Sequence, residues 1–185
     1  MNIELESMAI EMPPVEGHPN REPFRGVLTL VDVPSDRPPA GARGHCVVLT
    51  RGAAEAALAS LLGMGLDYAP SLDRHDARRK VGVITRAEIQ GRSLELRGYL
   101  FAKDFPEVVR EIGMTRPRAR GRAFRAHTEP ARTSTRVLGM SYEIADARVA
   151  DVRDKVWILT KVTFTGAAIL WRDKAAYRET WIDLG

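Results

Sequence analysis

Alternating apolar and polar residues recur along this chain, and a period of two predicts strands with one buried face. The clearest stretch is residues 93–101, where leucines alternate with serine, glutamate and arginine. It follows residues 81–86 through a short segment that contains Gly91, so we expect the two stretches to form a hairpin. A turn is expected at residues 67–70. Further strands are predicted at residues 26–33, 44–50, 137–144 or beyond, and 156–164.

Two other stretches have the spacing of an amphipathic helix. Residues 53–62 carry alanine and leucine at helical spacing and precede Gly63, a residue that favours the left-handed conformation of a helix end. A second helix is expected from Asp104, where Glu107 completes a capping box and Gly113 ends the helix. Its apolar residues fall at i, i+3, i+4 and i+7: Phe105, Val108, Val109 and Ile112.

These elements predict a mainly β protein with flanking helices, in the α+β class. Because the strands outnumber the helices and do not alternate with them, we expect a mainly antiparallel sheet curled into a closed or nearly closed antiparallel β-barrel. The 185 residues, 44% of them hydrophobic and 28% charged, are enough for one domain. We place a flexible N-terminal arm at residues 1–22, the barrel domain at residues 23–172, and a polar C-terminal segment, which a helix would fit, at residues 173–185.

Positive charge is concentrated in one segment. The net charge is +4, yet residues 115–136 contain seven arginines against the single acid Glu129 and therefore carry +6. This segment also contains Pro, Gly and Thr, so we expect an arginine-rich loop that is either simply solvated or in contact with DNA or an acidic protein. No membrane partner and no export are expected, because the sequence has neither an apolar stretch of roughly 20 residues nor a leader-like start.

Two polar residues near the expected strands are candidates for chemistry. His75 lies before the strand at residues 81–86, and Ser141 interrupts the strand at residues 137–144. A serine hydroxyl becomes an effective nucleophile when a neighbouring imidazole takes its proton. A solvated surface histidine and a serine at a sheet edge are the alternative interpretation. Glu143 stands where a G-x-S-x-G elbow would have its second glycine, so an α/β-hydrolase is disfavoured.

No cofactor and no metal site are expected. His18, His45, His75 and His127 are scattered without the spacing of metal ligands. Cys46 is the only cysteine, which excludes an intrachain disulfide and a cysteine-based metal site.

Five segments occur in an informative order. They are His75 before Val81-Gly82-Val83, then Gly98-Tyr99-Leu100-Phe101, Asp104-Phe105-Pro106-Glu107-Val108-Val109, Leu138-Gly139-Met140-Ser141-Tyr142-Glu143, and Phe164-Thr165-Gly166-Ala167-Ala168-Ile169-Leu170. Together they resemble the prohead (capsid maturation) proteases of tailed bacteriophages over roughly residues 24–172. That family is related to the herpesvirus assemblins, so the resemblance implies a closed β-barrel ringed by helices, with a serine nucleophile and a histidine base on neighbouring strands.

The resemblance also implies roles for individual residues. Ser141 would attack the scissile carbonyl, His75 would accept and return the proton, and backbone N–H groups near the serine would stabilise the oxyanion. Family members commonly place an acid on the last long strand, but that position holds Lys161, which cannot accept the imidazole N–H. Thr163, two residues further on, is therefore the expected third member. Glu143, on the same side of its strand as the serine, is one alternative, and a dyad with water is another.

The function implied by the resemblance is that of a serine endopeptidase that cleaves scaffold and capsid-protein extensions during phage head maturation and also cleaves itself. Its partners would be capsid and scaffold proteins inside the assembling prohead, in the host cytoplasm, and a homodimer is expected by analogy. The alternative is a catalytically inactive assembly or scaffold-binding protein of the same fold.

Overall fold

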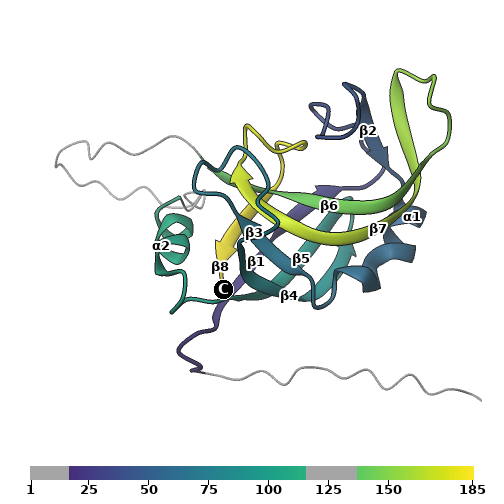
Figure 1. Ribbon diagram of the computed structural model, residues 1–185. Coiled ribbons are helices and arrows are strands. Elements are labelled where there is room, and N and C mark those ends of the chain that lie inside the picture. Colours follow the sequence, from purple (N-terminus) through teal and green to yellow (C-terminus); the bar gives the residue numbers. More distant parts are fainter. Residues whose placement is uncertain (1–16, 116–136) are drawn as a thin grey trace, which may run out of the picture.

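The computed structural model describes residues 17–115 and 137–185, and in this part of the chain eight strands form one mixed sheet. The sheet curls into an open half-barrel accompanied by two short α-helices (Figure 1). The strand order is β2-β7-β3-β4-β5-β1-β8, and β6 pairs with β7. The mainly β, α+β class is therefore confirmed. The strands are β1 (Glu22–Leu30), β2 (Cys46–Leu49), β3 (Gly65–Tyr68), β4 (Lys80–Gln90), β5 (Ser93–Leu100), β6 (Leu138–Val149), β7 (Val156–Trp171) and β8 (Trp181–Leu184).

Two expected segments fall largely outside the described residues. These are residues 1–16 of the N-terminal arm and residues 116–136 of the arginine-rich loop. Among the helices of the described part, none has the length and apolar character needed to cross a membrane.

β7 organises the sheet, because it pairs with three other strands. β6 runs antiparallel to β7, whereas β2 and β3 run parallel to it (Figure 1). The expectation of a mainly antiparallel sheet holds for five of the seven strand pairs in the described residues, but not for β2 and β3 against β7. The chain passes from β2 to β3 through α1 (Arg51–Ala57), a connection that lets both strands run in the same direction. The expected closure is also wrong: within the described residues β8 pairs with neither β2 nor β6 at the other end of the sheet, and the half-barrel stays open.

The hairpin of β4 and β5 is confirmed, and Gly91 at its turn has a φ of 58°, a value that favours glycine. Two other expectations are wrong. Residues 67–70, expected as a turn, belong partly to β3, which is largely buried and pairs with β4 on one side and β7 on the other. Residues 173–185 form no helix; instead β8 pairs with β1, because that pairing buries Ile182.

Both predicted helices exist, but the second begins differently from the expectation. Thr50 caps α1 through its side chain, and a short 3₁₀ helix, η1 (Leu58–Leu61), follows. α2 (Pro106–Met114) has no side-chain cap, so the expected capping box is wrong, as is the end at Gly113. Both acids of the expected capping box have other partners: Asp104 accepts a hydrogen bond from Asn20, and Glu107 accepts one from Arg79.

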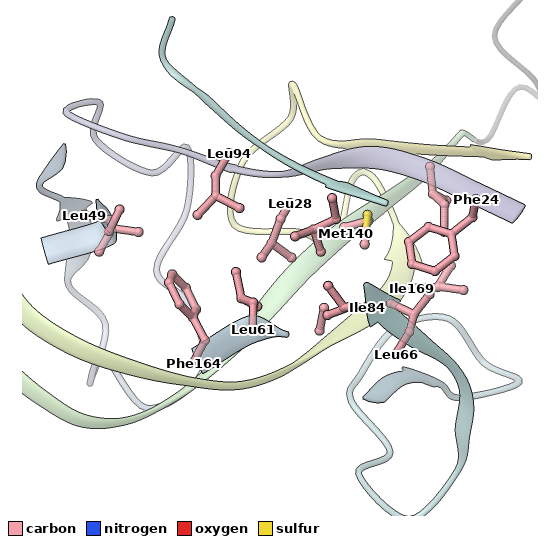
Figure 2. Close-up of a cluster of buried hydrophobic side chains, with 14 of the residues drawn as sticks. Phe24, Leu28, Leu49, Leu61, Leu66, Ile84, Leu94, Met140, Phe164 and Ile169 are labelled. Atoms are coloured by element: carbon pink, nitrogen blue, oxygen red, sulfur yellow. The ribbon is translucent and has the colours of Figure 1, made fainter. Parts of the chain in front are cut away.

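The apolar core fills the half-barrel and fixes the position of β6. Figure 2 shows Met140 of β6 among side chains from several other strands, including Phe24 and Ile84. Met140 is fully buried, and a side chain at Gly26 of β1 would collide with its sulfur. The strand that carries Ser141 is thus anchored by the residue that precedes it.

Candidate active site

Ser141 and Glu143 lie on the face of β6 that points away from the apolar core. Side chains alternate along a strand, so Met140 and Tyr142 point the other way, and the Tyr142 ring meets the edge of Phe164 at 6.0 Å between centroids. Across the sheet Ser141 is in register with Ala168 of β7, which is itself in register with Asp67 of β3. Ser141 and Asp67 therefore flank the same alanine.

His75 reaches this face from the loop between β3 and β4. Its Nδ1 lies 3.3 Å from Oε1 of Glu143, and both side chains are half-buried. The loop is anchored to β3, because the backbone N–H of Asp76 donates to Oδ2 of Asp67 at 2.6 Å. A ring whose Nδ1 faces a carboxylate directs its Nε2 to the opposite side, as a general base beside a serine requires.

Glu143 is also bound by a cation. Nζ of Lys80 lies 3.2 Å from Oε2 of Glu143, so the carboxylate joins an imidazole and an ammonium group. Two glycines make room for this pair. A Cβ at Gly166 would lie 2.5 Å from Oε2 of Glu143, and a Cβ at Gly65 would lie 2.6 Å from Cδ of Lys80.

Asp67 is a functional candidate that the sequence did not reveal. It is fully buried, its Oδ1 has no hydrogen-bond partner, and its neighbours in the strand are apolar. Burial and the nearby charge of Glu143 raise the pKa of the Asp67 carboxyl. The sequence signal for Asp67 is an acid inside an apolar run that ends in Pro70, and this pattern also predicts a turn.

One cavity of about 490 Å³ connects the candidate residues. His75, Ser141 and Glu143 all line it, although 66 positions separate the histidine from the serine (141 − 75). Within the described residues, no hydrogen bond joins the Ser141 hydroxyl to His75. The remaining lining residues are Pro39, Ala40, Gly41, Ala42, Val47, Tyr142, Ile144, Ala147, Val149, Trp157 and Leu159.

Thr163, the expected third member, is not brought to this cavity. Its hydroxyl lies 3.5 Å from the exposed Asp146. Lys161 is also distant, because it is in register with Arg148 near the other end of β6. The carboxylate that contacts His75 is Glu143, the alternative residue.

Three donor groups at this site could hold a metal ion. Ligand atoms of Asp67, His75 and Glu143 lie within 4.8 Å of one another, and a histidine with two carboxylates suits a divalent cation such as Zn²⁺. The sequence did not indicate this group, because it contains one histidine and two acids from different strands. Lys80 already places a positive charge on Glu143.

The comparisons with known proteins add no relative: no family model, no curated protein and no solved structure matches the chain.

Proposed function

We propose that this protein is a serine-type endopeptidase in which Ser141 is the nucleophile, His75 the general base and Glu143 the acid that orients the imidazole. The observation that carries the proposal is the 3.3 Å contact of His75 Nδ1 with Glu143, in the cavity that Ser141 also lines. A carboxylate at Nδ1 holds the tautomer whose free Nε2 can accept a proton.

The reaction would proceed through an acyl-enzyme. As the Ser141 oxygen attacks the scissile carbonyl, Nε2 of His75 takes the hydroxyl proton and then gives it to the leaving amine. Glu143 stabilises the resulting imidazolium and remains ionised itself. Backbone N–H groups near the serine stabilise the oxyanion. A water molecule, deprotonated by His75, then hydrolyses the ester and restores the enzyme.

The resemblance to prohead proteases supports a more specific role. In that role, the enzyme cleaves scaffold and capsid proteins inside the assembling prohead, cleaves itself, and acts as a homodimer. The serine on a long strand and the histidine that shares its cavity support this role, whereas the open half-barrel and the position of His75 in a loop depart from the closed barrel and the strand histidine that the resemblance implies. The arginine-rich loop at residues 115–136 would then contact DNA or an acidic protein.

The test uses the purified full chain and its Ser141→Ala variant. We expect a fluorophosphonate probe to label the wild type, and we expect mass spectrometry to detect cleavage of the chain itself or of a scaffold protein. Both signals should be lost in Ser141→Ala and retained in Ser93→Ala, a control serine on β5. Cleavage that survives the loss of Ser141 would contradict the assignment.

Metal removal tests the other use of the same residues. No step above involves a metal, so EDTA should leave the rate of cleavage unchanged. A loss of cleavage with EDTA that Zn²⁺ restores would instead assign Asp67, His75 and Glu143 to a metal-dependent hydrolase.

An inactive assembly protein is the second candidate. It is favoured by the Lys80–Glu143 ion pair, which occupies the carboxylate, and by the missing hydrogen bond between Ser141 and His75 in the described residues. This candidate predicts that the chain elutes together with scaffold protein in gel filtration, without probe labelling and without cleavage.

A further inference from the structure

The cavity extends well beyond the three polar groups of the proposed site. Besides His75, Ser141 and Glu143, no lining residue is an acid, a lysine, an arginine or a histidine. The additional wall comes from β2, β6 and β7 and from the loop that follows β1. Its apolar side chains are Val47, Ile144, Val149, Trp157 and Leu159, with alanines at positions 40, 42 and 147.

β6 has an unpaired edge beside this cavity. In the described part of the chain, β7 is the one strand that pairs with β6. Residues 141–144 are consecutive and all line the cavity, although neighbouring side chains of a strand point to opposite faces. The cavity therefore reaches the backbone edge of β6. Along residues 141–144 this edge pairs with no described strand, whereas the N–H of Met140 already donates to Oγ1 of Thr180.

We propose that this cavity binds the substrate as an extended peptide that adds to the open edge of β6. Leu159 is in register with Val149, eight positions along β6 from Ser141, so the peptide places an apolar side chain against the wall formed by Val47, Trp157 and Leu159 at a position several residues from the scissile bond. The inference rests on the proposed function, because a carbonyl at Ser141 fixes where the neighbouring residues of the peptide lie. Main-chain hydrogen bonds supply affinity in strand addition, and side-chain pockets supply specificity.

The chemistry of the wall selects the substrate class. A charged side chain in this part of the cavity would lose its hydration and find no charged partner, whereas an apolar side chain gains by leaving water. The cavity volume of about 490 Å³ lies inside the range of roughly 300–1,000 Å³ that is common for ligand sites. A segment of a few residues fits this size.

The first experiment maps cleavage sites. Reduced and denatured casein is digested with the full chain, and the fragments are identified by mass spectrometry. We expect one position, several residues from the cut bond, to hold leucine, isoleucine, valine, methionine or phenylalanine at least about tenfold more often than charged residues. Cuts with no apolar preference would overturn the inference yet leave the peptidase intact. Absence of Ser141-dependent cleavage would instead overturn the proposed function.

A matched pair of variants tests the location of the wall. Ala147 and Ala145 are both exposed on β6, but Ala147 lines the cavity and Ala145 does not. Ala147→Trp should raise KM for a peptide taken from a mapped site by at least about tenfold with a smaller change in kcat, whereas Ala145→Trp should change neither. Equal effects of the two variants would overturn the placement.

Strand addition itself is tested with peptides that carry one N-methyl group, which removes one backbone donor. We expect binding to the Ser141→Ala variant, measured by calorimetry, to be lost at alternate positions of the peptide, because every second N–H faces β6. Tolerance of N-methylation at every position would rule out the added strand. This measurement needs no turnover, so it reports on the site even where cleavage fails.

Discussion

The β4–β5 hairpin and the strip formed by β3, β7 and β6 belong to one sheet, but they are held together in different ways. In the hairpin, pairing runs from Gly82 with Leu100 to Gln90 with Ser93, between neighbouring segments of sequence that bury leucines. In the strip, β6 and β7 also pair as consecutive strands, but β3 joins β7 from about 100 residues earlier in the chain. On this strip Glu143 contacts His75, from the loop after β3, and Lys80, at the start of β4. Local pattern is sufficient for the first region, whereas the second carries polar pairs that only the fold brings together.

The largest effect is expected from Glu143→Gln. An amide keeps the shape of the side chain but can offer its NH₂ group to the imidazole and favour the wrong tautomer, so kcat should fall by about 10³-fold or more. The free energy of unfolding should stay close to that of the wild type. Asp146→Asn, an exposed acid on the same strand with no contact to His75, is the control. Equal rates for Glu143→Gln and wild type would show that Glu143 does not orient His75 in the reaction.

The same contrast explains which parts of the fold and of the site could be predicted from the sequence. Alternating leucines predicted β5, and helical spacing predicted α2, because these signals are contained in a single segment. The parallel partners of β7 could not be predicted, since β2 and β3 are short and their neighbour lies about 100 residues later. His75 and Ser141 were singled out by residue type, yet their shared cavity required the folded sheet. Asp67 could not be predicted as a site residue, because an acid in an apolar run usually marks a turn or an exposed face.

Two glycine substitutions, one in each region, sharpen the comparison. A side chain at Gly98 of β5 would meet the backbone oxygen of Val83, so Gly98→Ala should lower the free energy of unfolding by about 1–3 kcal/mol with little change in kcat/KM once folded. A side chain at Gly166 would push against the Glu143 carboxylate, so Gly166→Ala should reduce kcat by at least about tenfold with a smaller loss of stability.

Urea denaturation and initial rates measure the two effects separately. Gly113→Ala in α2 is the control, because its nearest neighbour would be at an ordinary 3.8 Å and alanine favours a helix. If Gly98→Ala and Gly166→Ala changed stability and rate in the same proportion, the distinction between the two regions would fail.

A smaller effect is expected from Asp67, which we interpret as a positioning residue beneath the His75 loop. Asp67→Asn keeps an oxygen that can accept the N–H of Asp76, whereas Asp67→Ala removes it. We therefore expect kcat to decrease several-fold more in the alanine variant than in the asparagine variant, with similar KM values. Equally impaired variants would indicate that the charge of Asp67 matters, rather than its hydrogen bond.

The smallest effect is a pH dependence of stability that has opposite signs at two aspartates. Because the pKa of Asp67 is raised by burial and by Glu143, the folded protein binds this proton more tightly than the unfolded chain does. The stability gained is fully present below the ordinary value of 3.8 and is lost as pH rises through the raised pKa. Wild type should thus lose stability relative to Asp67→Asn in urea denaturation as the pH rises from the ordinary value of 3.8 through the raised pKa of Asp67.

Asp151, in the turn between β6 and β7, provides the opposite case. Hydrogen bonds from Arg153 lower the pKa of the Asp151 carboxyl, so its contribution is present above the ordinary value of 3.8 and is lost as pH falls through the lowered pKa. Wild type should then gain stability relative to Asp151→Asn as pH rises, by a small amount because the pair is exposed. The difference in stability between wild type and variant should therefore change with pH in opposite directions for the two aspartates. A change in the same direction would mean that Asp67 is not held in the buried setting beside Glu143 that distinguishes the strip from the hairpin.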